Sequence, residues 1–187
     1  MQFKNLILAA SAAVTASALP AANTTSTTGE STFGVIAIHS TSAVQYAAFA
    51  AAKSSLFAGL AHPNATCARP AEQSATFYIN DGALFLYDES ATPQEIFVDA
   101  SGMGQGVIGY TTGAQSAPGE RKGWAIDAND HLQFGGKDLI ACPNSIDGAW
   151  SIWADAGYAN PGYNSDCVGI AARVEKTSNP NGCVYTQ

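Results

Sequence analysis

The segment from residue 123 to residue 153 constrains the fold most, because it divides into four short stretches separated by turns. Strands are predicted at 124–127, 131–134, 138–142 and 149–153, with turn chemistry at Asn129-Asp130, Gly135-Gly136 and Asp147-Gly148 between them. Leu132 and Phe134 lie two residues apart, as do Trp150 and Ile152. A period of two gives each strand one buried and one solvated face, so the segment predicts a compact antiparallel sheet.

Further strands are predicted on both sides of this segment. The clearest is a hairpin over 75–87, in which ATFYI and ALFLY flank the turn residues Asn80-Asp81-Gly82. Residues 42–60 are ambiguous, and we interpret them as a strand followed by a helical turn. Other strands are predicted at 33–39, 95–99, 107–111, 168–175 and from residue 183. Eight or more short strands with little helix predict an all-β fold, an antiparallel sandwich or barrel.

The N-terminal residues 1–18 have the pattern of a secretory signal peptide. Lys4 precedes a short apolar run, and small residues lead to a cleavage site after Ala18. The apolar run is too short and too rich in Ala and Ser to cross a bilayer, so no membrane association is predicted. Residues 19–31 lack apolar periodicity and are predicted to be a flexible lead-in. Residues 32–187 then have the length of a single all-β domain of a secreted, extracellular protein.

All four cysteines follow the predicted signal peptide: Cys67, Cys142, Cys167 and Cys183. An even number in a secreted chain predicts two disulfides, and the absence of C-x-x-C spacing argues against a metal site. Three pairings are possible. If the last strands form a meander, Cys142 and Cys183 lie at the same end, whereas a strand of about 20 Å separates Cys167 from Cys183. This geometry favours Cys142 with Cys183 and Cys67 with Cys167.

The net charge bears on the binding partners, and two sequence motifs predict glycosylation. The chain has 15 acidic and 8 basic residues and a formal charge of −7, which argues against nucleic acid as a partner. Asn23 and Asn64 each begin an N-x-Thr glycosylation acceptor. Asn64, in a proline-flanked loop, is the better candidate of the two.

The partial matches to cofactor-binding and metal-binding motifs lack the neighbouring residues or elements that those motifs need, and catalytic motifs are absent. Residues 104–109 fit G-x-G-x-x-G, but a strand and a Pro/Gly loop follow instead of the helix that would hold a pyrophosphate, so no cofactor is predicted. Asp127-x-Asn129 begins like a calcium loop yet lacks the required glycine. Neither a G-x-S-x-G elbow nor an H-E-x-x-H helix is present, and the carboxylates near the central segment are explained by turns. We therefore expect no catalytic residues and no enzyme.

Aromatic residues near the central segment permit a carbohydrate contact. Flat rings can stack on pyranose faces, while neighbouring amides and carboxylates bind hydroxyl groups. The alternative is core packing, and alternation along 150–153 predicts that Trp150 points inward. The exposed candidates for carbohydrate contact are Trp153, Tyr158 and Tyr163.

Several long strings, including AAKSSLFAGL, SGMGQG, IGYTTGAQ, GKDLIACPNSIDG and WSIWADAG, resemble the PhiA cell-wall proteins of filamentous fungi over essentially the whole mature chain. The resemblance implies a secreted structural wall protein of phialide and conidium development, with some relatives known as allergens. Its partners would be cell-wall polysaccharide or other wall proteins. It supplies no catalytic residues. A wall-polysaccharide binding module and a wall-remodelling glycosidase remain alternatives.

The second half also resembles, more distantly, the cysteine-rich C-terminal domain of yeast wall proteins with internal repeats. The shared order is GWAID, HLQFGGKDLIAC, WSIW and the two last cysteines. The yeast proteins carry Gln-containing repeats that are esterified to β-1,3-glucan, and no such repeat occurs in this chain. A noncovalent or disulfide-linked association with the wall is therefore expected.

Overall fold

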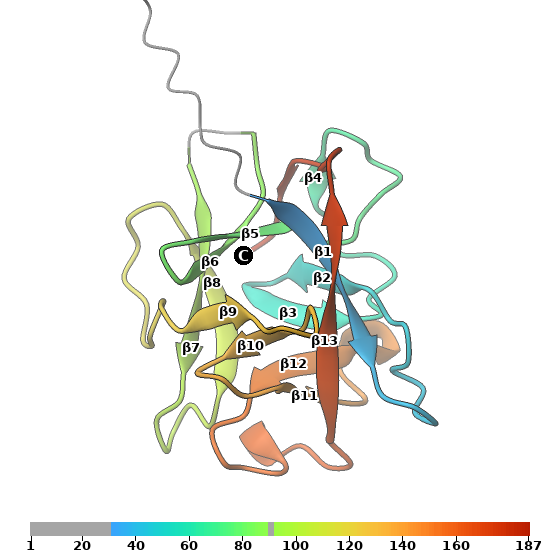
Figure 1. Cartoon of the computed structure of the whole chain (residues 1–187), viewed down its shortest axis with the longest axis vertical. Coiled ribbons are helices and arrows are strands. Elements are labelled where there is room, and N and C mark those ends of the chain that lie inside the picture. Colours follow the sequence, from blue (N-terminus) through green and yellow to red (C-terminus); the bar gives the residue numbers. More distant parts are fainter. Residues whose placement is uncertain (1–30, 90–91) are drawn as a thin grey trace, which may run out of the picture.

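The structure, a computed structural model, describes residues 31–89 and 92–187 and consists mainly of antiparallel strands (Figure 1). The predicted signal peptide (1–18), the lead-in up to residue 30 and Asn23 lie outside the described residues. Nine strands close into a barrel in the order β1–β13–β11–β12–β3–β8–β7–β6–β5. Their bounds are β1 Thr32–Ile38, β3 Ser55–Ala58, β5 Phe77–Asn80, β6 Ala83–Leu86, β7 Gln94–Asp99, β8 Val107–Thr112, β11 Leu139–Cys142, β12 Trp150–Ala154 and β13 Val168–Thr177.

The remaining elements are short and lie around this barrel. They are β2 Phe49–Ala52, β4 Thr66–Cys67, β9 Trp124–Ile126, β10 Leu132–Phe134, β14 Cys183–Val184 and the 3-10 turns η1 Ile146–Gly148 and η2 Pro161–Tyr163. The all-β expectation is confirmed, and the architecture is a barrel. No helix among the described residues is long and apolar enough to cross a membrane.

Period-two alternation builds the barrel wall. In β1 every second residue is buried, and β1 pairs with β13 over its whole length, from Thr32 opposite Thr177 to Ile38 opposite Ala171. Figure 1 shows these two strands side by side and running in opposite directions. The inward side chains fill the interior, so the barrel has a packed core. Its largest fully buried members are Tyr110, Phe33, Phe49, Phe77, Leu56, Leu84, Leu86, Ile96, Ile108, Leu132, Leu139 and Ile170.

The ambiguous region 42–60 forms a hairpin, so the expected helical turn is wrong. β2 pairs with β3 from Phe49 opposite Ala58 to Ala52 opposite Ser55. Lys53 and Ser54 form the turn with φ of 47° and 56°, the left-handed values that a two-residue hairpin turn needs. The alanines of β2 are all buried, so their small size serves close sheet packing and not helix formation.

The β9–β10 hairpin forms its own two-stranded sheet and adds to the core. Trp124 N donates to Gly82 O at 3.1 Å, and Val174 N donates to Asp130 O at 2.8 Å, which ties the hairpin to the β5–β6 turn and to β13. Trp124 meets Phe134 edge-on at 5.1 Å between ring centroids. The central segment of the sequence therefore contributes both to the barrel wall and to this hairpin.

Both disulfides exist, but the expected pairing is wrong. The bonds are Cys67–Cys183 and Cys142–Cys167. β13 starts beside the end of β11, with Ala141 opposite Val168, so Cys167 lies next to Cys142. The chain then runs the length of β13 before it reaches Cys183, which pairs directly with Cys67 in the β4–β14 ladder. A meander does not place Cys142 and Cys183 at one end, because β13 carries the chain away from Cys142.

The C-terminal residues are anchored inside the barrel wall (Figure 1). Buried Gln94 on β7 forms paired hydrogen bonds with the backbone of Tyr185: Tyr185 N donates to Oε1 at 2.8 Å, and Nε2 donates to Tyr185 O at 2.9 Å. Ser54 N and the Tyr110 hydroxyl both donate to Thr186 O. The C-terminal tail is thus part of the core and not a loose end.

Candidate carbohydrate-contact groove

A groove of about 300 Å³ runs over the outer surface of the barrel where β3, β8 and β12 meet. Residues in or next to the turns η1 and η2 contribute to its lining. We call it the η1–η2 groove. Its lining residues are Ser55, Leu56, Phe57, Val107, Ile108, Ser145, Ile146, Ser151, Ile152, Trp153, Gly162 and Asn164.

Strand alternation explains which side chains form the floor. In β12 the buried residues Ile152 and Ala154 point into the barrel, so Ser151 and Trp153 point outward. β12 pairs with β3 through Ser151 opposite Phe57, which brings outward residues of both strands together. Phe57 itself is only 6% exposed, because it packs with Ile146 and Leu60 in a small cluster outside the barrel. Phe57 therefore supports the floor, and Trp153 is the aromatic ring available to a ligand.

Two contacts hold Trp153 in a defined position. Its Nε1 donates to Ser151 Oγ at 2.9 Å, and Gly162 lies directly against the six-membered part of the indole ring. A Cβ on residue 162 would lie 2.4 Å from Cη2 of Trp153, so only glycine allows this approach. The half-buried indole thus packs against η2 and also lines the groove.

The turn η2 is tied to neighbouring loops. Gly162 N donates to Gln105 Oε1 at 2.9 Å, which joins η2 to the β7–β8 loop. Asn164 Nδ2 donates to Pro161 O at 2.7 Å and closes the turn from within. Between Gly162 and Asn164, the side chain of Tyr163 is 97% exposed. Tyr163 therefore stands at the rim of the groove.

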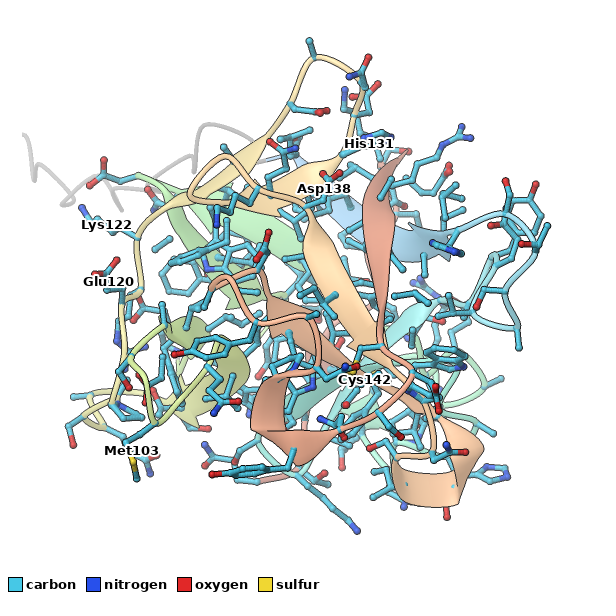
Figure 2. The ribbon with its side chains drawn as sticks, turned by 90° about the horizontal axis from the view of Figure 1, so that it is seen from below. Met103, Glu120, Lys122, His131, Asp138 and Cys142 are labelled. Atoms are coloured by element: carbon cyan, nitrogen blue, oxygen red, sulfur yellow. A yellow bond between two sulfur atoms is a disulfide. The ribbon has the colours of Figure 1, made fainter. Side chains whose placement is uncertain are left out.

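The three predicted contact residues do not form a single cluster. Trp153 is in the groove and Tyr163 is at its rim, whereas Tyr158 is absent from the lining. The Tyr158 hydroxyl lies against Gly102 in the β7–β8 loop, and the side chain is 40% exposed. Next to Gly102, Met103 projects outward at the edge of the molecule (Figure 2). Tyr158 thus belongs to an adjoining surface formed by the β7–β8 loop.

Our sequence reasoning missed the groove residues contributed by β3, η1 and η2. One signal was available: Ser55-x-Phe57 and Ser151-x-Trp153 repeat the same polar-x-aromatic spacing. That signal acquires meaning only through the pairing of β12 with β3, which joins segments almost a hundred residues apart. No sequence pattern identified Ser145 or Asn164 as residues of the groove.

The groove lining contains no ionisable side chain. A larger groove of about 530 Å³ differs in this respect, because it is lined by Arg69, Glu72, Glu175 and Lys176 among others. Among the described residues, His, Cys, Asp and Glu form no group of three or more that could hold a metal ion. The η1–η2 groove can therefore offer apolar surface, hydroxyls and one amide, but no acid, base or metal ligand.

The carboxyls with shifted pKa values are explained by local contacts in turns. A hydrogen bond with Lys122 lowers the pKa of Asp81, and hydrogen bonds from Ser101 lower that of Asp99. The pKa of Asp127 is lowered chiefly by the hydrogen bond from His131 N to Oδ1, at 2.8 Å. Asp99 and Asp127 therefore accept backbone hydrogen bonds within their own turns, whereas Asp81 pairs with the Lys122 side chain.

Asn64 lies on the surface near η1. The side chain is exposed, its Nδ2 donates to His62 O at 3.2 Å, and together with Ile146 and Asp147 it lines a further groove. A sugar on Asn64 would project beside η1 without meeting the core.

Comparison with known proteins gives matches over the whole chain. The sequence model of a family described as PhiA-like secreted protein matches residues 33–186. A protein of Aspergillus fumigatus named Cell wall protein phiA is 70% identical over 189 residues, covering all of both chains. Proteins with the same name are 69% identical in Aspergillus niger, over all of this chain and 99% of the relative, and 40% identical in Arthroderma benhamiae, over 94% and 98%. No solved structure gives a significant match.

Proposed function

Because the chain belongs to the PhiA-like secreted protein family, we propose that it is a non-catalytic structural protein of the fungal wall, used where phialides and conidia develop. Its secretion and its place in the cell wall follow from the family and from the named relatives. The developmental role and the absence of catalysis are proposals, and the resemblance described above supports the first of them.

The observation that carries the non-catalytic proposal is the uncharged η1–η2 groove. A glycosidase generally needs two carboxyl groups flanking the scissile bond, about 5 to 9.5 Å apart. The groove best suited to a sugar has none in its lining. Asp155, the nearest candidate acid in sequence, instead accepts a hydrogen bond from Gly157 N at 2.8 Å and faces Lys137 at 3.8 Å. This supports a role in binding or structure.

Sequential extraction of walls tests the structural role. Conidial and hyphal walls are extracted with detergent, then with reductant, then with mild alkali, and each fraction is probed for the protein. We expect release by detergent or reductant and enrichment in conidial walls, because the chain lacks the Gln-containing repeats that carry ester links in yeast wall proteins. Release by alkali alone would contradict noncovalent or disulfide attachment, and absence from conidial walls would contradict the developmental role.

A direct assay tests the absence of catalysis. The purified protein and its Asp155→Asn variant are incubated with β-glucan, and newly formed reducing ends are counted. We expect no turnover above buffer for either protein. Turnover that disappears in Asp155→Asn would establish a glycosidase instead.

Contact with wall polysaccharide is a second candidate function. The supporting observation is that Trp153 lines the groove and that Tyr163, 97% exposed, lies between the lining residues Gly162 and Asn164. The test is co-sedimentation with insoluble β-glucan and with chitin. Loss of sedimentation in Trp153→Ala supports the contact, and sedimentation unchanged by Trp153→Ala would remove it.

Glycosylation at Asn64, and at Asn23 in the lead-in, also remains a proposal. Its support is the exposed Asn64 side chain in a proline-flanked loop. Enzymatic removal of N-glycans from the secreted protein should lower its mass, and Asn64→Gln should remove most of that difference. A mass that neither treatment changes would contradict occupancy.

A further inference from the structure

We propose that the η1–η2 groove binds a short stretch of a neutral pyranose chain, with one sugar stacked on Trp153 and the next against Tyr163. This proposal rests on the polysaccharide contact proposed above and specifies its place and its ligand class. It assigns a role to the polar groups of Ser55, Ser151 and Asn164, which our sequence reasoning did not select.

The composition of the groove matches the two kinds of surface on a pyranose ring. The C–H face of a sugar is apolar and packs on aromatic rings, while its hydroxyls at the ring edge need hydrogen-bond partners. Trp153 supplies the aromatic surface. Ser55, Ser151 and Asn164 supply hydroxyl and amide groups around it. The volume of about 300 Å³ is at the lower limit for ligand sites, so it suits a segment of a longer chain.

The uncharged lining selects among wall polymers by charge. The chain as a whole has a formal charge of −7, and other grooves on its surface contain ionisable groups such as Arg69, Lys53 and His62. A cationic amino sugar would lose water in the η1–η2 groove without gaining an anion, and an anionic sugar would find no cation. Neutral glucose or N-acetylglucosamine units lose no charge solvation there. Neutral chains are therefore the favoured occupants.

Hydrogen bonds hold the turn that carries Tyr163. The φ of Tyr163 is 61°, in the left-handed region that bulky residues rarely adopt. The ring of Tyr163 is almost wholly in solvent, and Tyr46 is also exposed with a left-handed φ, so the position of the ring beside the groove is what distinguishes Tyr163. Because Gly162 N is bound to Gln105 and Asn164 Nδ2 to Pro161 O, the turn is preorganised. A turn held in this way loses little backbone entropy when its tyrosine contacts a ligand.

Titration with soluble oligosaccharides tests the proposal. The probes are a β-1,3-linked glucose oligomer, an N-acetylglucosamine oligomer and a glucosamine oligomer, each titrated into the mature protein at low and at high sodium chloride concentration. We expect one or both neutral oligomers to bind with a Kd that salt leaves unchanged, and their comparison identifies the source of the chain. Glucosamine oligomers should bind only at low salt, through the acidic surface.

Variants locate the binding in the groove. Trp153→Ala and Tyr163→Ala should each weaken binding of the neutral oligomer by about tenfold, or about 1.4 kcal/mol. Tyr46→Ala is the matched control, because Tyr46 is 70% exposed with a φ of 64° but lies on the β1–β2 loop outside the groove. Ser55→Asp should give the glucosamine oligomer a site in the groove while weakening the neutral ones. Thermal melting shows whether each variant is folded. If Trp153→Ala does not fold, the surface change Tyr163→Ala alone tests the proposal.

Three outcomes would overturn the proposal. They are no binding of either neutral oligomer, binding of the neutral oligomers that high salt abolishes, or the same Kd for the neutral oligomer in Tyr163→Ala and Tyr46→Ala. None of them affects the structural role, which wall extraction tests separately. If the wall retains Tyr163→Ala as it retains the unaltered protein while oligomer binding is lost, the groove is a ligand site but not the anchor. If co-sedimentation with insoluble polymer persists without oligomer binding, the contact function stands and its place in the groove is wrong.

Discussion

Tyr46 and Tyr163 share a left-handed backbone and exposed rings, whereas Tyr110 and Tyr185 are buried in the core. The same residue type therefore serves two opposite purposes. In the core each phenol needs a partner: Tyr110 donates to Thr186 O, and Tyr185 accepts from Thr76 N at 3.2 Å. At the surface the phenol is solvated by water, so φ and exposure alone do not separate Tyr163 from Tyr46, and the place of Tyr163 beside the η1–η2 groove does.

The close approach of Gly162 to Trp153 gives a residue-scale prediction. Gly162→Ala should lower the free energy of unfolding by about 2–4 kcal/mol, since it combines a left-handed φ with overpacking against the indole. Gly157→Ala is the matched control, because Gly157 also has a positive φ but nothing lies within 4 Å of its added Cβ. We expect about 1 kcal/mol for Gly157→Ala. Chemical denaturation measures both, and equal losses would contradict the packing of η2 on Trp153.

The buried tyrosines predict loss of stability at high pH. Burial raises the pKa of Tyr185 to about 12, and burial also raises that of Tyr110. Above pH 10 the unfolded chain loses these protons while the folded protein retains them, so stability falls as pH rises, by up to about 1.4 kcal/mol per pH unit for each phenol. Tyr185→Phe should flatten this fall. Denaturation at several pH values above 9 measures it, and parallel curves for both proteins would refute the assignment.

Among the strands, a hairpin with a recognisable local turn was predicted from the sequence, whereas one that depends on long-range pairing was not. The 75–87 hairpin was predicted correctly because its turn lies within a few residues of both strands, with Asn80 opposite Ala83. The 42–60 region was mispredicted because alanine favours a helix in isolation. The outcome there was decided by β3, whose partners β8 and β12 come from distant parts of the chain. The helix propensity of alanine is therefore outweighed where the segment can pair with neighbouring strands of a sheet.

Tyr185, in the C-terminal tail, makes both of its backbone hydrogen bonds with one side chain of a distant strand, Gln94. Gln94→Leu should lower the free energy of unfolding by about 2–4 kcal/mol, because it leaves the buried N–H and C=O of Tyr185 without partners. Thr112→Val is the control, since it removes only the weaker bond from Gln94 Nε2 to Thr112 Oγ1 at 3.2 Å. Hydrogen exchange at Tyr185 should accelerate in Gln94→Leu. Equal destabilisation by the two changes would mean that the tail is held by other contacts.

For the whole molecule, a closed barrel leaves few free edges, and two disulfides hold loops of different size. Cys67–Cys183 spans 116 residues, and Cys142–Cys167 spans 25. The longer bond ties the C-terminal tail to the β4 strand, and the shorter one ties the start of β13 to the end of β11. Both bonds reinforce contacts that strand pairing also makes, but the first closes a much longer loop than the second.

Removal of the two disulfides should lower the free energy of unfolding by different amounts. Chain entropy alone assigns about 4.8 kcal/mol to the 116-residue loop and about 3.5 kcal/mol to the 25-residue loop. Cys67→Ala/Cys183→Ala should therefore destabilise the protein more than Cys142→Ala/Cys167→Ala. Unfolding in denaturant compares the two variants. A larger loss for the Cys142–Cys167 pair would show that native contacts of the β11–β13 corner, and not loop size, dominate.

The sequence by itself determined the fold class, the oxidised cysteines, most strands and the family, because alternation, turn residues and family strings are local properties of the chain. Only the tertiary structure decided which cysteines pair, that the strands close into a barrel, and that Ser55, Trp153 and Asn164 share one groove. Those facts depend on which strand lies next to which. Strand order is a global choice among many pairings of similar local quality, and the packed core and the tail bound to Gln94 select one of them.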